Sequence, residues 1–418
     1  MALESTVSLS SWDITYPVKD DVSNEYHSVY RPIVFNISNT VAQSSSRTTR
    51  RCKIEMLVTG AQVGSPIIID PDLGSNVDFT FDAAPFMRNY VEGKLVAIGQ
   101  GSDTVTTDGN VAVTLRLRIR EIYENGNGDL IETALEDMGS SNKIVCCNAA
   151  YDDYQLGDGV IGSTNNDGVV KGFKRSNAPN KQWLRRGDSA FMGHFRNENN
   201  DTSITYQLRV YDATGTAISI DLPVSLYTAS GTPYAFQHGV GAANVLADYP
   251  SALPSNAAYY TISYAGTGSV GSENSGTYQF WLDDDCDETY ERFFFMNQFG
   301  FYDSFNFKGA KVRTASSKFE RTRMQRTLGR QSDQTTNLTP TIGNRKGISY
   351  TAHSGLIKED ELLWLEELIT SPEVYVVRNG DYFPVIIRDS KAVTEDKASG
   401  LVTMKITYEL THNNRQRS

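Results

Sequence analysis

Short β-branched segments bounded by turn-forming residues recur along the whole chain, and they constrain the fold more than any other feature. Clear examples are YRPIVFNIS (30–38), CKIEMLVTG (52–60) and SPIIIDP (65–71). A longer stretch, residues 111–135, alternates apolar and polar positions around a Gly-containing turn, which is typical of a hairpin. We therefore predict a mainly β protein, with several β-sandwich-like domains in series and a few short helices.

The length of 418 residues is enough for roughly two to four domains of ordinary size. The segment from about 148 to 180 is rich in Gly, Asp and Asn, which is typical of a linker or a long loop. We predict an N-terminal β-sandwich domain over 1–147 and a middle β domain with loop-rich linkers over 148–277. The predicted C-terminal β domain, 278–418, contains an aromatic hairpin, a basic arm and one helix.

Two segments have the pattern of a helix. DAAPFMRNYVEG (82–93) predicts a short one, capped by Asp82 and closed by Gly93. KEDELLWLEELITSP predicts the one clear helix, near 358–371, with acids crowded into its first turn. Its expected apolar stripe is Leu362, Leu365 and Ile369, with Trp364 and Leu368 beside it.

Turn chemistry marks the connections between strands. Asn379-Gly380 is the strongest hairpin signal in the sequence, and DATGT (212–216) predicts a second tight turn. The stretches 229–245 and 264–280 are rich in Gly and Ser, and we expect them to be loop-rich interruptions of the middle domain.

No sequence motif indicates catalysis or a cofactor. The five histidines are scattered, and GVGAAN (239–244) matches part of a dinucleotide fingerprint but ends in Asn, so a loop is expected there. Cys52, Cys146, Cys147 and Cys286 form no Cys-x-x-Cys pair, which favours reduced thiols over a zinc site or a disulfide framework. We expect no enzymatic activity, no metal and no cofactor.

Composition narrows the classes of partner. The formal net charge of −11 argues against general nucleic-acid binding, which needs a basic face. No apolar run has the length of a membrane span, and the N-terminus lacks the basic start and apolar core of a signal peptide. We therefore expect a chain made and folded in a cytosol.

An acid run and a base run flank the densest aromatic block. DDDCDETYE (283–291) lacks the regular spacing of a calcium loop, so a solvated acidic turn is favoured over a calcium site. KVRTASSKFERTRMQRTLGR (311–330) has seven basic residues, but only Phe319 interleaves with them, which favours pairing with acidic surface over a nucleic-acid arm. The interface candidates are Asp283, Asp284, Asp285, Asp287, Glu288, Lys311, Arg313, Lys318, Arg321, Arg323 and Arg326.

The aromatic block itself is RFFFMNQFGFYDSFNFKG (292–309), with eight Phe and Tyr residues among eighteen. In an extended segment its odd-numbered phenylalanines point to one side. Aromatic side chains bury about 150–250 Å² each, so a hairpin that supplies the core of the C-terminal domain is favoured over an exposed carbohydrate platform. The core candidates are Phe293, Phe295, Phe299, Phe301, Phe305, Phe307 and Trp364.

The order of these motifs resembles a family of virion structural proteins from phages and prophages of Bacteroidota and from some marine phages. YRPIVFNIS and FTFDAAPFMRNYVEG are similar to the family's early strand and its Phe-Asp…Tyr-Val segment. The aromatic block resembles the family's Phe-Leu-Asn-x-x-Gly-Gly-Trp/Phe-Asp-x-Phe-x-Phe hairpin, with Phe299-Gly300-Phe301 where Gly-Gly is usual. LLWLEELITSPEVYVV with YFPVIIRDS is the most specific match, whereas the N-terminal half matches loosely.

The resemblance implies a tail-associated protein of the virion without catalytic residues. The expected function is a ring-forming tail component, in the distal tail or baseplate, that assembles with copies of itself and other tail proteins and supports host attachment. The alternatives are a neck or head–tail connector ring, a carbohydrate-binding receptor-recognition protein and a cell-wall hydrolase. A receptor binder would show an exposed aromatic groove, and a hydrolase would show paired carboxylates across a cleft.

Overall fold

The computed structural model confirms the mainly β prediction, because strands dominate its described residues and only three short helices lie among them. The described residues are 3–18, 26–41, 47–73, 75, 77–92, 95–102, 105–107, 111–140, 142–148, 176, 178–195, 203–228, 235–268, 271–274, 277–283, 290–309, 311–321, 341–396 and 401–411. The chain divides into two compact units. The first comprises 1–176, 180–283 and 297–302, and the second 177–179, 284–296 and 303–418.

Two sheets at the start of the first unit enclose one hydrophobic core. The first sheet has the order β1 (Leu3–Ser8), β2 (Trp12–Val18), β4 (Val34–Asn39) and β7 (Asp78–Asp82). The second has the order β3 (Tyr26–Ser28), β12 (Ile144–Cys147), β9 (Ala112–Glu124), β5 (Thr48–Val58) and β6 (Ala61–Ile69), and β10 (Leu130–Glu132) and β11 (Glu136–Asp137) also pair with β9. Alternate residues of both sheets, such as Trp12 and Ile14 on β2 and Leu115 and Leu117 on β9, are buried in the shared core. This arrangement is a β-sandwich.

The middle of the chain adds a second core to the first unit. Its larger sheet has the order β13 (Lys181–Leu184), β20 (Tyr278–Leu282), β18 (Tyr259–Gly268), β15 (Ser203–Tyr211) and β16 (Ala217–Thr228), and β19 (Gly271–Asn274) pairs with β18. A smaller sheet has the order β14 (Phe191–Phe195), β17 (Ala235–Gly239) and β8 (Val105–Thr107), and helix α3 (Ala242–Asp248) follows β17. The expectation that 229–245 and 264–280 are loop-rich interruptions is therefore wrong, since β17, α3, β18 and β19 occupy much of them.

Part of the predicted N-terminal segment belongs to this second core. Strand β8 pairs with β17, and the Tyr206 hydroxyl donates to Ser102 Oγ at 2.8 Å. The Ser102 N–H donates to the Asn244 carbonyl at 3.2 Å. Residues 102 and 105–107 thus belong to the second core, and the chain rejoins the sandwich at β9. The periodicity of the sequence does not indicate this change of core.

The GVGAAN motif is the second correction in this region. It lies between β17 and α3, so a strand does lead through a turn into a helix where a loop was expected. The turn is closed by the side chain of Asn244, whose Oδ1 accepts the N–H groups of Ala190 at 2.9 Å and Gly241 at 3.1 Å. A Cβ on Gly241 would lie 2.3 Å from the Ala190 nitrogen. The glycine therefore permits close backbone packing within the protein.

The second unit is one seven-stranded sheet with a helix against it. The strand order is β22 (Tyr302–Phe307), β21 (Glu291–Met296), β25 (Val374–Arg378), β26 (Asp381–Asp396), β27 (Leu401–Leu410), β24 (Thr341–Lys358) and β23 (Val312–Arg321), with helix α4 (Glu359–Thr370). Trp364, Leu365 and Leu368 of α4 are buried in its core, which confirms the predicted helix. The expected stripe was misplaced at one end, because Ile369 is 37% exposed.

Two local predictions have different outcomes. The Asn379-Gly380 hairpin is confirmed, since both residues adopt the left-handed region, at φ 52° and 82°, and join β25 to β26. The helix expected over 82–93 is only α1 (Ala84–Met87). Its predicted cap Asp82 accepts the Ala84 N–H at 3.0 Å, while Gly93 lies outside the described residues.

Candidate functional site

The aromatic block is core rather than surface, although it does not form one continuous core. Phe293, Phe295, Phe307 and Trp364 are buried in the second unit, and Phe305 packs half-buried against them. The indole N–H of Trp364 donates to Asp303 Oδ2 at 2.8 Å, so its polar atom is satisfied.

The expectation of one shared aromatic face fails at the turn of the hairpin. Phe299 and Phe301 are buried but belong to the first unit, because the turn 297–300 interrupts the alternation of the two strands. The Phe301 ring lies against Gly193 of β14, where an added Cβ would be 2.1 Å from Phe301 Cγ.

The acid run and the base run are not fully separated in the structure. Glu291, the last residue of the acid run, is only 3% exposed and pairs with Lys311 of the base run within the same chain. Arg378 donates from Nε to Glu291 Oε1 at 3.1 Å and from Nη2 to the Tyr408 hydroxyl at 3.0 Å. Lys311 and Glu291 are therefore not available as two complementary surfaces of a subunit interface.

Two tyrosines bound to this ion cluster have shifted pKa values. Burial, then the nearby Glu291 carboxylate, raises the pKa of Tyr408. Burial alone would also raise the pKa of Tyr350, but its hydrogen bonds with Arg378 and Arg313 outweigh burial and lower that pKa. The hydrogen bonds of Arg378 to Glu291 and Tyr408 thus link β21, β25 and β27.

Neutralising Glu291 tests this cluster. Glu291→Gln leaves Arg378 and Lys311 without their shared carboxylate, and we expect a loss of about 2 kcal/mol in the free energy of unfolding, since both cations are partly exposed. Urea unfolding of the two proteins measures the loss. The matched control is Glu409→Gln, whose carboxylate pairs with an exposed Arg388 at 3.1 Å. Equal losses in the two variants would contradict a structural role for the Glu291 cluster.

The other interface candidates are only partly placed. Asp283 is half-buried, and its N–H donates to the Leu184 carbonyl at 2.7 Å. Arg313 is exposed on β23. Lys318 and Arg321 lie on the same strand, but their side chains fall outside the described residues, as do all of Asp284, Asp285, Asp287, Glu288, Arg323 and Arg326.

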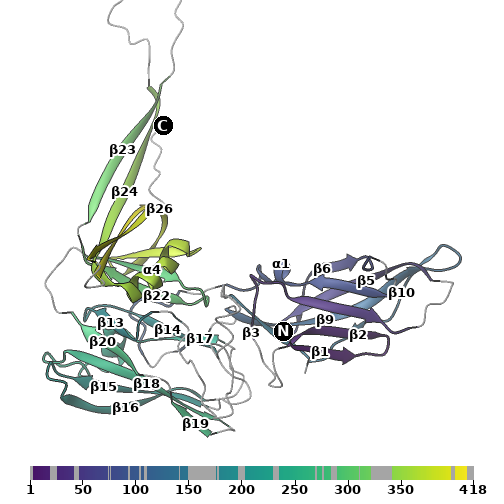
Figure 1. Ribbon diagram of the computed structural model, residues 1–418, viewed down its shortest axis with the longest axis horizontal. Helices are drawn as coiled ribbons and strands as arrows, with labels where there is room; N and C mark the ends of the chain where they lie inside the picture. The colour runs from purple at the N-terminus through teal and green to yellow at the C-terminus, as the bar shows by residue number, and fades with distance from the viewer. Residues whose placement is uncertain are drawn as a thin grey trace, which may run out of the picture. The chain divides into compact units, whose positions relative to one another are not determined.

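A two-stranded ribbon extends from the sheet of the second unit (Figure 1). Strands β23 and β24 pair from Val312↔Thr351 to Arg321↔Thr341, whereas the pairing of β24 with β27 begins only at Ser349↔Glu409. Residues 341–348 therefore have β23 as their strand partner, and residues 311–316 are all exposed. We call 312–321 with 341–348 the β-arm.

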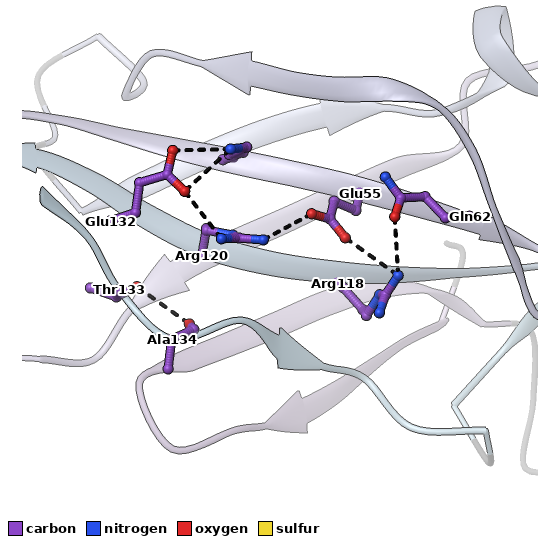
Figure 2. A network of polar contacts seen from close by, with 8 residues as sticks. Glu55, Gln62, Arg118, Arg120, Glu132, Thr133 and Ala134 are labelled. Carbon is purple, nitrogen blue, oxygen red and sulfur yellow. Dashed lines mark hydrogen bonds and ion pairs between the residues drawn. The ribbon is translucent and has the colours of Figure 1, made fainter.

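A ladder of ion pairs covers the outer face of the sandwich's larger sheet (Figure 2). Glu55 accepts from Arg120 at 3.0 Å and pairs with Arg118 at 3.4 Å, and Glu132 pairs with Arg120 at 3.1 Å. A hydrogen bond from Lys53 lowers the pKa of Glu132. A general acid needs a raised pKa, so Glu132 suits structural ion pairing rather than general-acid catalysis.

Sequence reasoning missed a buried histidine pair. His194 on β14 and His238 on β17 are fully buried, and their rings stack with centroids 5.5 Å apart. The His238 Nε2 atom hydrogen-bonds to the Tyr264 hydroxyl at 2.7 Å, and burial lowers the pKa of His238 to about 3. Because β14 and β17 are far apart in sequence, no local motif announces the pair.

Sequence reasoning also missed an aromatic row on the larger middle sheet. Trp183, Trp281, Tyr259 and Tyr211 lie directly opposite one another on β13, β20, β18 and β15. Centroid separations along the row are 5.4, 4.6 and 4.8 Å. Trp183 is 45% exposed. Successive residues of a strand point to opposite faces, so Phe280 faces the core and the adjacent Trp281 faces outward. Such an aromatic residue at an outward-facing position is the signal that could have revealed the row.

The described residues include neither a metal-binding cluster nor a membrane-spanning helix. In the part of the chain that the structure describes, no group of three or more His, Cys, Asp or Glu residues is placed to hold a metal ion. Cys52, Cys146 and Cys147 are buried, and burial raises the pKa of Cys146, while Cys286 lies outside the described residues. None of the described helices is long and apolar enough to cross a membrane.

Comparisons with known proteins add little to this geometry. No protein-family model matches the chain, and no curated protein matches it. Among solved structures, the FN1–FN3 domains of chicken CNTN1 are similar over 65% of this chain and 78% of that chain, at 9% identity and a TM-score of 0.15. A likeness of this size carries no argument about fold or function.

Proposed function

We propose that this chain is a structural protein of a bacteriophage virion and that copies of it form a closed ring in the tail, at the distal tail or baseplate. It is made in the cytoplasm of the bacterial host and assembles there with other tail proteins. The observation that carries the proposal is the β-arm. A neck or head–tail connector ring is the alternative location, and cryo-EM of whole particles distinguishes the two.

The β-arm needs a partner for a physical reason. A two-stranded ribbon alone is marginally stable in water, because it lacks a third strand and a buried apolar face. In the part next to the sheet, residues 311–316 are exposed, and Val312 is 50% exposed. A neighbouring subunit that covers this ribbon would supply the missing contacts, and a head-to-tail contact of this kind closes into a ring when the rotation allows it.

The motif that most resembles the virion family has a structural role here, which supports the proposal. The Ser371 hydroxyl donates to the Glu373 carbonyl at 2.8 Å just after α4 ends, and the Tyr375 hydroxyl donates to Glu373 Oε2 at 3.0 Å. These bonds direct the chain from α4 into β25, whose Val374 and Val376 are buried. The matched residues therefore build the core of the unit that carries the β-arm.

Shortening the β-arm tests the proposal. A variant with residues 317–346 replaced by a short Gly-Ser turn keeps the sheet residues of β24 from 349 onward. We expect the full chain to form a closed oligomer and the variant to be a folded monomer, as measured by light scattering after size exclusion and by circular dichroism. The control is an equally simple replacement of the β9–β10 turn, 125–129, which should leave assembly unchanged.

Charge reversal tests the contribution of the basic residues separately from that of the ribbon. Arg321→Glu combined with Arg323→Glu and Arg326→Glu should weaken assembly most at low salt, because exposed charges set register and association rate more than affinity.

A shortened variant that still forms the full oligomer would refute the proposal, as would a full chain that stays monomeric at high concentration.

A further inference from the structure

The aromatic row lies on the outer face of its sheet. Its members alternate along each strand with core residues, such as Leu184 next to Trp183 and Tyr260 next to Tyr259. Cross-strand aromatic pairs do stabilise sheets, yet that role leaves Trp183 on the edge strand β13 with 45% of its surface exposed. An exposed tryptophan at the end of an aromatic row is a feature of a binding surface.

The rings are offset rather than fully overlapped. Tyr211 and Tyr259 are 4.8 Å apart at 9° between planes, and Tyr259 and Trp281 are 4.6 Å apart at 18°. Atoms of stacked rings touch at about 3.5–4.0 Å, so these centroid separations include a sideways shift. The row crosses four strands, or about 14 Å, and Trp183 at its end is the exposed member, while the other three rings are half-buried.

A polar row runs parallel to the aromatic row on the same face. Two residues along each strand, Lys181, Gln279, Thr261 and Arg209 also lie directly opposite one another. Lys181 and Arg209 are exposed, and Gln279 is half-buried. An amide and two cationic groups are thus placed beside the aromatic row.

Positive charge lies on the row itself. The Lys181 ammonium is 4.0 Å from the Trp281 ring centroid and 5.5 Å from that of Trp183. Asp212, which follows Tyr211, is engaged in its own turn, where its Oδ1 accepts from Thr214 Oγ1 at 2.7 Å and from the Thr216 N–H at 2.9 Å. The cations at the two ends of the polar row complement an anionic ligand.

We propose that this sheet face binds an acidic oligosaccharide, with the apolar faces of the sugar rings on the aromatic row and the carboxylates near Lys181 and Arg209. Gln279 suits the sugar hydroxyls, since an amide group both donates and accepts, whereas Thr261 is buried and donates to the Arg209 carbonyl at 3.5 Å. A single-stranded nucleic acid would also use aromatic rings with cations. It is disfavoured because each nucleotide carries a phosphate and the two cations neutralise few of them.

The test uses the full chain and two probes of equal length, an oligogalacturonate and a neutral cello-oligosaccharide. Calorimetry and tryptophan fluorescence should show tighter binding of the oligogalacturonate. Trp183→Ala should weaken it about tenfold or more, equivalent to about 1.4 kcal/mol. Lys181→Gln combined with Arg209→Gln should remove the preference for the acidic probe and its salt dependence.

Tyr30→Ala is the matched control, because Tyr30 is 46% exposed, has the Arg88 guanidinium 5.6 Å from its ring centroid, and lies outside the row. It should bind like wild type. The proposal is overturned if Tyr30→Ala weakens binding as much as Trp183→Ala, or if the double variant keeps the acidic preference. It is also overturned if neither sugar binds at millimolar concentration, or if oligouridylate binds more tightly than the oligogalacturonate. Ring assembly is scored separately, so loss of sugar binding with intact oligomers leaves the proposed structural role standing.

Discussion

Phe295→Ala is expected to lower the free energy of unfolding of the second unit by about 3–5 kcal/mol. Phe295 is fully buried, and its ring packs against Trp364 of α4 with centroids 5.8 Å apart. Truncation to alanine removes apolar burial and leaves a cavity between the sheet and its helix, which only partly collapses. Urea unfolding followed by the fluorescence of Trp364 measures the change.

Two further variants make this result specific to core packing. Phe305→Ala should cost less than Phe295→Ala, because Phe305 is only half-buried against the same core. Leu363→Ala, at a residue of α4 that is 62% exposed, should change the free energy of unfolding by less than about 0.5 kcal/mol. A Phe295→Ala protein as stable as wild type would show that the aromatic block is not the core of this unit.

Acid is expected to destabilise the middle core of the first unit through His238. Burial lowers the folded-state pKa of His238 from 6.5 to about 3, so between these values the unfolded chain binds a proton that the folded chain excludes. Stability is therefore complete above pH 6.5 and falls as the pH drops toward 3, by about 1.4 kcal/mol per pH unit. The side chains around the ring are His194, Tyr206 and Tyr264.

Hydrogen exchange of peptides from β14, β17 and β18 measures this locally. Their protection, corrected for the intrinsic exchange rate, should decline from pH 6.5 to pH 4.5 in wild type and decline less in His238→Gln. His353→Gln, at a half-buried histidine of the second unit, is the control and should follow wild type. Equal acid sensitivity of His238→Gln and wild type would exclude His238 as the source.

Local physical rules determined much of what the sequence predicted correctly. The alternation in 111–135 predicted β9, its turn and β10, because a residue's side in a strand follows directly from period two. Asn379 and Gly380 predicted the β25–β26 turn because few other residues tolerate positive φ at both positions. Burial of Trp364, Leu365 and Leu368 followed from helical spacing, although Ile369 shows that the edge of such a stripe depends on what the helix packs against.

Only the tertiary structure decided which segments meet. Periodicity assigns faces to a strand but names no partner, so it could not place β8 beside β17, or His194 beside His238. It also could not show that Glu291 pairs with Lys311 within one chain, because the position of a charge depends on strand order. The aromatic row has the same origin: Trp183 and Tyr211 become members of one surface only when β20 and β18 lie between their strands.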